Sequence, residues 1–290
     1  MKNIFKSQVG QHVSRSSFGT FIIMLLLVLL SLLMMFPFVY AIMQSLKPAE
    51  EIFAFPPKLF VRSPNFDNFR SLFNIASSLT VPFSRYVFNS AFISIIGTFV
   101  YALIASMASY SLAFGRFTGK KLLNDLIIKA LLFSSPVTAV AQYLIIASFN
   151  MLNTYWAILL PSLALPIGVF LMRQFLVQMI PMSIIEAARI DGLDEFSLLL
   201  RIIMPVVKPA LLTLVLFTFQ TLWNASGASF IYEEEFKVLP SVMAELVAGG
   251  ISRAGEGAAA TILLMVPPVL VFFFTESNVI ETMATSGIKE

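Results

Sequence analysis

The chain has 290 residues, of which 58% are hydrophobic and only 12% are charged, and its formal net charge is +3. A soluble domain of this length cannot bury so much apolar surface, so the composition predicts one integral membrane domain with room for about six spans. The absence of cysteine excludes disulfides, thiol catalysis and cysteine-ligated metals. The single histidine, His12, is expected on the surface of the N-terminal tail, and it leaves no convincing transition-metal or Ser/His catalytic site.

The first apolar segment, 18–43, follows a polar and basic tail, 1–17. It is long enough to cross a bilayer, and no small-residue cleavage site follows it. We therefore expect an uncleaved first helix with Pro37 near its outer end. A long polar loop with several prolines, 44–86, comes next.

Five further apolar segments complete an all-α prediction of six transmembrane helices within 18–275. We expect these spans at 86–114, 126–149, 155–172, 206–232 and 257–275. An acidic loop that begins with Glu233, Glu234 and Glu235 precedes the last span. Lys and Arg are more numerous in the loops on the side of the N-terminus, which favours cytoplasmic tails at 1–17 and 276–290.

The middle of each predicted span lacks Asp, Glu, Lys, Arg and His. A charge there costs roughly 2.5–3.5 kcal/mol on insertion scales and is retained for function, so coupling through titrating groups of this chain is not expected. Neutral polar side chains remain, and they suit a neutral, hydroxyl-rich solute, although each could instead bond to a neighbouring helix. They are Ser134, Ser135, Thr138, Gln142, Gln220, Thr221, Asn224, Ser226 and Ser229.

A polar run between the fourth and fifth spans predicts two short helices separated by a glycine. Ser183 precedes Glu186 by three residues, a capping-box pattern that would begin a helix over 184–190. Gly192 stands where a left-handed residue ends such a helix, Asp194 can cap a second helix, and Pro205 would end it.

The same run carries side chains that favour a docking surface. Ala187 and Ala188 have almost no side chain, so another protein could approach the backbone closely. Apolar side chains also occur in this otherwise polar stretch, namely Ile184, Ile185, Leu193 and Phe196.

This run resembles the EAA loop in the membrane subunits of binding-protein-dependent ABC importers. The residues that fit the pattern are Glu186, Ala187, Ala188, Asp191, Gly192, Phe196, Pro205 and Pro209. Leu193 and Met204 are mild departures from it. Other stretches resemble the carbohydrate, maltose-type (MalG-like) branch, among them 86–117, the pair Trp223-Asn224 and 237–240, whereas 225–227 departs from that branch.

The resemblance implies a type I ABC importer permease fold in a bacterial or archaeal cytoplasmic membrane. It also implies a second homologous permease subunit, two ATPase subunits that bind ATP and Mg, and an extracytoplasmic solute-binding protein. The loop at about 173–208 would couple to the ATPase through Ser183, Glu186, Ala187, Ala188, Arg189, Asp191, Gly192, Phe196 and Pro205. This chain carries no G-x-x-x-x-G-K-[ST] loop, so it is expected to be non-catalytic and without a cofactor of its own.

Two further sets of residues are expected to contact the solute and the binding protein. A sugar pathway would involve Ser135, Thr138, Gln142, Gln220, Trp223 and Asn224. The loop from Glu233 to Gly257 would meet the binding protein or the pore mouth, with Gly249 and Gly250 allowing close backbone approach. The alternatives are an ABC permease for an amino acid, phosphonate or metal chelate, or a self-sufficient carrier or channel.

Overall fold

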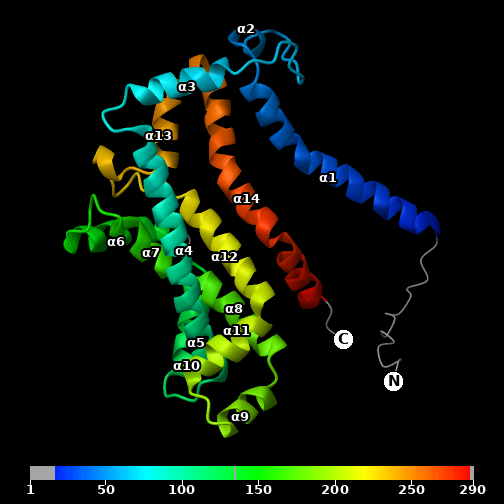
Figure 1. The fold of residues 1–290 in the computed structure, drawn as a ribbon, viewed down its shortest axis with the longest axis vertical. Coiled ribbons are helices and arrows are strands. Elements are labelled where there is room, and N and C mark those ends of the chain that lie inside the picture. The colour runs from blue at the N-terminus through cyan, green and yellow to red at the C-terminus, as the bar shows by residue number, and fades with distance from the viewer. Residues whose placement is uncertain (1–16, 134, 288–290) are drawn as a thin grey trace.

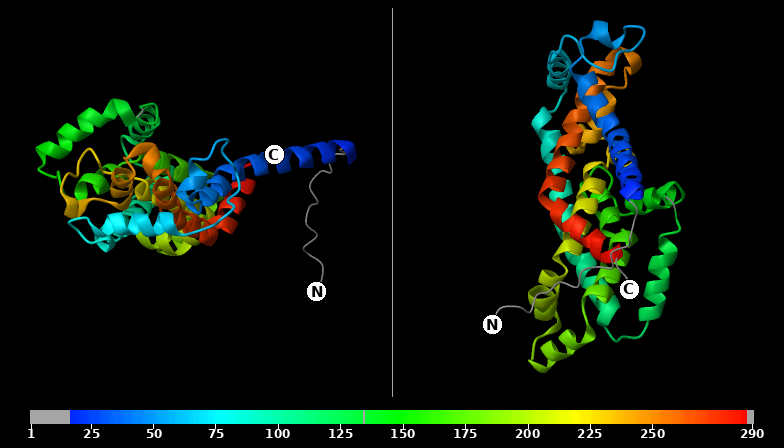
Figure 2. Two further views of the ribbon diagram at one scale, coloured as in Figure 1. Left: turned by 90° about the horizontal axis from the view of Figure 1, so that it is seen from above. Right: turned by 90° about the vertical axis from the view of Figure 1, so that its right-hand side faces the viewer.

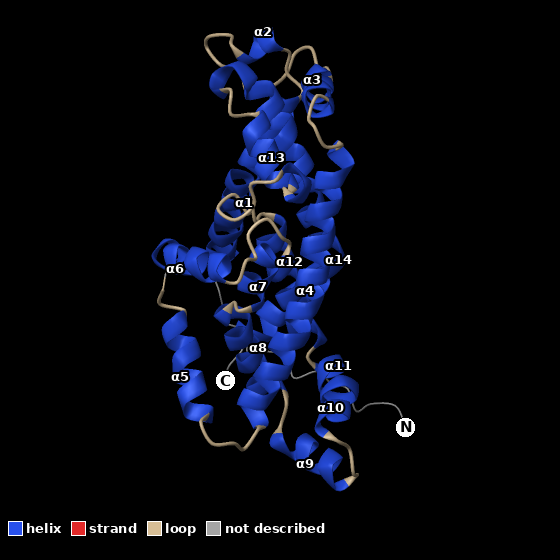
Figure 3. Ribbon diagram, turned by 90° about the vertical axis from the view of Figure 1, so that its left-hand side faces the viewer, coloured by secondary structure: helices blue, strands red, loops and turns tan. Residues whose placement is uncertain are grey.

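The computed structural model describes residues 17–133 and 135–287. His12, Ser134 and the tail ends 1–16 and 288–290 lie outside the described residues. The described part is helical without strands, as Figure 3 shows. Its main elements are α1 (Ser17–Ser45), α4 (Phe83–Phe114), α5 (Lys120–Ala130), α6 (Ser135–Ser148), α7 (Trp156–Leu163), α8 (Pro166–Met179), α12 (Lys208–Trp223) and α14 (Ala254–Gly287).

The short helices gather at the two ends of an elongated molecule (Figure 1). One end, here called the outer end, carries α2 (Ala49–Ile52), α3 (Asp67–Ser77), η2 (Glu234–Phe236), α13 (Leu239–Leu246) and η3 (Gly250–Arg253). The other end, called the inner end, carries α9 (Met182–Ile190), α10 (Glu195–Ser197), the π-helix η1 (Leu198–Ile203) and α11 (Met204–Val206).

Four stretches in the described part are long and apolar enough to cross a membrane, so the chain is a multi-pass membrane protein. They are Phe18–Ser45, Phe83–Phe114, Trp156–Met179 and Ala254–Glu276. A bent pair, Glu195–Val206 with Lys208–Trp223, raises the number to at most five. The first of these helices, α1, extends away from the bundle (Figure 2), and its most apolar stretch is not buried within the chain.

Helix α4 is the packing centre and lies against α7, α8 and α12. Small residues line its buried face, so neighbouring helices approach it closely. A Cβ at Gly97 would lie 2.7 Å from Cδ1 of Leu222 on α12, and one at Gly168 of α8 would lie 2.3 Å from Oη of Tyr101. Side chains of the neighbouring helices therefore occupy the space beside both glycines.

The expected third span is broken in two, which corrects the prediction of one helix over 126–149. Helix α5 ends as Leu132 and Phe133 donate hydrogen bonds to carbonyls three residues back. Pro136 then has no N–H with which to continue that helix. Helix α6 consequently leaves the bundle at an angle to α5 (Figure 1).

The expected fourth span is longer than 155–172 and is interrupted between α7 and α8. Pro166 lies in the first turn of α8, and Leu165 before it is extended. The carbonyl of Leu165 accepts a hydrogen bond of 2.5 Å from Tyr101. Arg173, which made the sequence look interrupted, is inside α8, and its Nε donates to the carbonyl of Leu112 at 3.4 Å.

The fifth and sixth spans also differ from their expected bounds. Helix α12 stops at Trp223 rather than near 232, and the following turns include Gly227 with a φ of +61°. Ser226 and Ser229 therefore lie outside the helix. Helix α14 continues past the expected end at 275 to Gly287, with Pro267 and Pro268 inside it.

Buried asparagines tie the outer end to the long helices. Nδ2 of Asn68 on α3 donates to the carbonyls of Ser45 (2.9 Å) and Lys47 (2.7 Å). Asn89, which is fully buried on α4, donates to the carbonyls of Glu235 and Lys237 at 2.9 and 2.8 Å. Its Oδ1 accepts a hydrogen bond of 2.8 Å from the Tyr155 hydroxyl. The segment before α13 is therefore ordered by α4, although the sequence suggested a loop without structure of its own.

We predict that Asn89→Ala lowers the free energy of unfolding by about 3 kcal/mol, because it leaves buried carbonyls and a buried hydroxyl without their partner. Thermal unfolding in detergent micelles measures the effect. Asn74→Ala on the exposed face of α3 is the matched control and should leave the midpoint unchanged. Equal midpoints for both variants would show that the Asn89 contacts do not order the outer end.

Candidate functional site

The inner end presents α9 far from the outer helices (Figure 1). Pro181 is its N-cap residue, and no side chain caps the helix. Because the helix begins at Met182, Ser183 lies within the first turn instead of at the cap. The expected capping box between Ser183 and Glu186 is therefore wrong, and both side chains are exposed.

The C-terminus of α9 is closed by a Schellman turn, which confirms the prediction for Gly192. Gly192 has a φ of +82°, and its N–H donates to the carbonyl of Arg189 at 3.1 Å. The N–H of Leu193 donates to the carbonyl of Ala188, also at 3.1 Å. Leu193 then packs against the buried cluster that includes Ala188.

Asp194 caps the next helix, as predicted. Its Oδ2 accepts hydrogen bonds from the backbone N–H groups of Phe196 (3.2 Å) and Ser197 (3.1 Å). Hydrogen bonds from the Ser197 side chain and backbone lower the pKa of Asp194, with a smaller contribution from Phe196. The carboxylate therefore stays ionised and accepts from the free N–H groups at the start of α10.

Pro205 does not end the second helix, contrary to the prediction. The helical path continues through η1 and α11 and stops at Val207, where α12 departs at 89°. Pro205 lies in the first turn of α11, and the N–H of Met204 donates five residues back to Leu199. The wider π turn thus accommodates Pro205, which has no backbone N–H. The helical path that begins at α10 ends before Pro209, which lies in the first turn of α12.

One face of this region packs inward and the other is exposed. Ile185 and Leu198 are fully buried in a cluster with Tyr110 and Phe114 of α4. Ala188 belongs to the same cluster, so it serves packing within the chain and not approach by another protein. The exposed face of α9 includes Glu186 and Ala187.

The exposed apolar side chains agree only in part with those expected from the sequence, because Ile185 is buried. Ile190 is 87% exposed and was missed, while Phe196 (53%) and Ile184 (39%) are exposed as predicted. Helical periodicity could have identified Ile190, because it follows the expected docking residue Ala187 by three positions and so lies on the same face of the helix. Ala187 is therefore flanked by exposed apolar side chains on the outward face of α9.

Arg189 is held within the chain. Its Nε lies 2.8 Å from Oε1 of Glu195, and the other carboxylate oxygen of Glu195 accepts a hydrogen bond from Tyr110 of α4. The bend between α9 and α10 is therefore fixed to the inner end of α4.

The proposed solute-pathway residues divide into two groups. Gln220 and Asn224 line a groove of about 800 Å³ between α1, α12 and α14, which also includes Thr261. Trp223 is instead buried, and its Nε1 donates to the carbonyl of Leu264 at 2.9 Å. Its ring stacks on Phe219, so Trp223 holds α14 against α12.

The remaining predicted residues do not join that groove. Thr138 and Gln142 are on α6, outside the groove's lining, and the side chain of Ser135 lies outside the described residues. At the outer end Gly250 has a φ of +67°. A Cβ at Gly249 would lie 2.8 Å from Cδ of Arg253, so the close approach at Gly249 is made by this chain's own side chain.

We predict that Asp194→Ala destabilises the start of α10, because the N–H groups of Phe196 and Ser197 lose their acceptor. Amide hydrogen exchange of those two residues should become faster. Asp191→Ala, on the exposed C-cap residue of α9, is the control and should leave their exchange unchanged. Unchanged exchange in Asp194→Ala would contradict the capping role.

No family profile matches the sequence. The chain is 24% identical over 283 residues to the arabinooligosaccharides transport system permease protein AraQ of Bacillus subtilis, covering 96% of this chain and 99% of that protein. It is 25% identical over 267 residues to the inner membrane ABC transporter permease protein YcjP of Escherichia coli, covering 91% and 94%. A chain of a bacterial ABC transporter that imports the acidic polysaccharide alginate has the same fold, with a TM-score of 0.74 at 18% identity over 89% of this chain and 95% of that one. Over nearly its whole length the chain is therefore similar to permease proteins of ABC transporters, and it shares the fold of a chain of the alginate transporter.

Proposed function

We propose that this chain is a membrane permease subunit of an ATP-driven importer that takes up a sugar or oligosaccharide. The observation that carries the proposal is α9, a short helix with an anchored inner face and an exposed face of Glu186, Ala187 and Ile190. The names of the relatives support the solute class, since AraQ is named for arabinooligosaccharides. The neutral groove side chains Gln220 and Asn224 agree with a hydroxyl-rich solute.

The membrane arrangement that we propose has six passes in a bacterial or archaeal cytoplasmic membrane. Five are α1, α4, α7 with α8, α12 and α14, and the broken pair α5 and α6 forms the sixth. Both chain ends and α9 then lie in the cytoplasm. Basic residues near the inner end support this orientation. Lys120 donates to the carbonyls of Ala113 (2.9 Å) and Gly115 (3.1 Å), where α4 ends.

The partners in this proposal are a second, homologous permease subunit, two cytoplasmic ATPase subunits and an extracytoplasmic binding protein. ATP and Mg would bind to the ATPase subunits. A second structure of a bacterial alginate ABC transporter, similar to this chain with a TM-score of 0.57, is in complex with a periplasmic protein, which supports a binding-protein partner. The exposed apolar surface of α1 supports burial against lipid or the second subunit.

In the proposed mechanism, closure of the ATPase dimer on ATP moves α9. The buried contacts of Ile185 and Ala188 with Tyr110 and Phe114 convert that movement into a displacement of α4. The permease pair then shifts from inward-facing to outward-facing, because ATP stabilises one of the two states more than the other.

We predict that Gly192→Val uncouples ATP hydrolysis from uptake. A side chain at a φ of +82° is strained by roughly 1 kcal/mol or more, so the turn that orients α9 would change. The measurement is sugar uptake and ATP hydrolysis by the assembled transporter in proteoliposomes. Gly119→Val is the matched control, because Gly119 has a φ of +93° and, like Gly192, open space around it. Wild-type uptake in Gly192→Val, or an equal loss in both variants, would contradict a specific role for the α9 turn.

We also predict that Glu186→Ala impairs uptake while Ser183→Ala does not. Ser183 caps nothing in this structure, so its removal should leave α9 intact. Glu186 is exposed on the proposed docking face and would lose a polar contact with the ATPase. Uptake rates of the two variants at matched membrane abundance test this difference. Similar rates for the two variants would remove Glu186 from the docking surface.

A further inference from the structure

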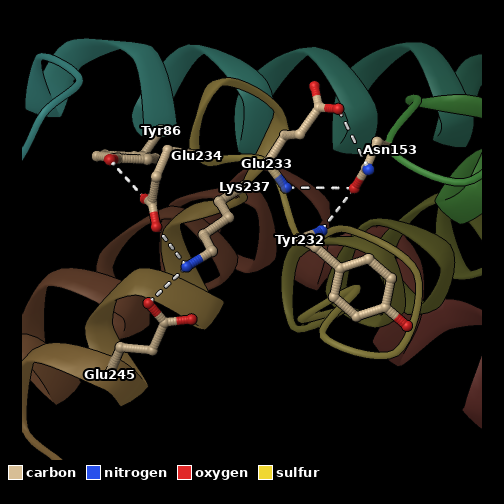
Figure 4. A network of polar contacts seen from close by, with 7 residues as sticks. All are labelled: Tyr86, Asn153, Tyr232, Glu233, Glu234, Lys237 and Glu245. Carbon is tan, nitrogen blue, oxygen red and sulfur yellow. Dashed lines mark hydrogen bonds and ion pairs between the residues drawn. The ribbon is translucent and has the colours of Figure 1, made fainter.

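The same three-residue arrangement occurs near each end of α4. At the outer end Tyr86, which is fully buried, donates to Oε2 of Glu234 at 3.1 Å. Nζ of Lys237 lies 2.6 Å from Oε1 of that carboxylate and 2.7 Å from Glu245 (Figure 4). One carboxylate thus receives a tyrosine on one oxygen and a cation on the other.

At the inner end Tyr110, which is 6% exposed, donates to Oε2 of Glu195. Nε of Arg189 lies 2.8 Å from Oε1 of the same carboxylate. In both arrangements the tyrosine belongs to α4, and the glutamate and the cation belong to a segment outside it. We call them the outer triad (Tyr86, Glu234, Lys237) and the inner triad (Tyr110, Glu195, Arg189).

The segments held by the two triads lie at opposite ends of the molecule. The outer triad holds the stretch that leads into α13, whereas the inner triad holds the bend between α9 and α10. The two tyrosines are about 36 Å apart along α4, at about 1.5 Å per helical residue. A displacement of either segment therefore pulls on the same helix through a charge-assisted hydrogen bond.

Helix α4 is suited to carry such a displacement over this distance. Among the candidate spans in the described part of the chain, α4 alone contains no proline. Helices α1, α7 and α14 have a proline inside them, and Pro205 and Pro209 lie on either side of the bend before α12. Because proline removes a backbone hydrogen bond and bends a helix, α4 is the least interrupted connection between the two ends.

We call residues 234–238, which lead into α13, the outer segment. We propose that Tyr86 and Tyr110 are positioning residues that couple this outer segment to α9 through α4. The inference rests on the proposed function, since it concerns how the binding protein outside affects ATP hydrolysis inside. Each triad would hold its segment in register with α4. Loss of either hydroxyl would loosen the attachment of that segment to α4, while its other contacts with α4 remain.

The experiment is a double-mutant cycle on the assembled transporter in nanodiscs. ATP hydrolysis is measured with and without sugar-loaded binding protein for wild type, Tyr86→Phe, Tyr110→Phe and the double variant. Each substitution removes one hydroxyl, while Asn89 still ties the outer segment and the buried cluster around Ile185 still anchors α9. We expect each single variant to keep basal hydrolysis and to lose about threefold to tenfold in stimulation. Tyr40→Phe on α1 is the control and should retain full stimulation.

The double variant distinguishes coupling from two local structural effects. If both triads act in series through α4, the double variant loses less stimulation than the product of the two single losses, because the more weakened connection already limits the signal along α4. The inference would be overturned if the loss of stimulation in the double variant equalled the product of the two single losses. Unchanged stimulation in either single variant would overturn it as well. A wild-type complex that the binding protein does not stimulate would overturn the proposed function and this inference with it, and that outcome is read from wild type alone.

Discussion

Close packing along one face of α4 is the constraint on which the rest of the structure depends. Gly97 admits the side chain of Leu222 from α12, and Gly168 admits the ring of Tyr101 toward α8. A methyl group at either site would force those side chains to rearrange, and packed interiors leave little room to do so. The bundle thereby holds α4 in place between the two ends of the molecule. The two ends of α4 hold the outer segment and α9.

Cationic side chains gather where α4 ends, close to its last carbonyl groups. The carbonyls that α4 leaves free at its inner end are met by cations, as Lys120 binds those of Ala113 and Gly115. Arg173 reaches the carbonyl of Leu112 from α8. Such contacts satisfy a helix terminus and oppose its partial negative charge. The proposed driving force comes from partner ATPases, which agrees with spans that carry no charge of their own near their centres.

Several features were predictable because they depend on local chemistry. A left-handed residue after α9 requires glycine, so Gly192 identified the turn, and Asp194 identified a cap. The apolar runs identified α1, α4 and α14. The breaks in the third and fourth spans were harder to place, because apolar composition continues through them. Arg173 gave a misleading end to the fourth span, since its partner, Leu112, is distant in sequence.

The candidate site also contains some features that the sequence predicted and others that it could not. The sequence indicated Glu186 and Ala187 as part of a docking helix, and both are exposed. It could not show that Ala188 packs inward or that Trp223 bonds to α14, because those roles depend on tertiary neighbours. The capping box failed for a related reason. Pro181 and the packing of Ile185 determine that α9 begins at Met182. The Ser183–Glu186 pattern therefore lies inside the helix, where it cannot form a capping box.

The central claim is that the exposed face of α9 is covered by an ATPase. Since the chain has no cysteine, a single cysteine at Ile190 gives a site-specific probe for cross-linking in membranes. The account predicts that Ile190→Cys forms a cross-linked product with the ATPase subunit, whereas Phe55→Cys, at an exposed position of the outer end, does not. The absence of a product at Ile190 in an assembled complex that hydrolyses ATP, or an equal product at Phe55, would contradict it.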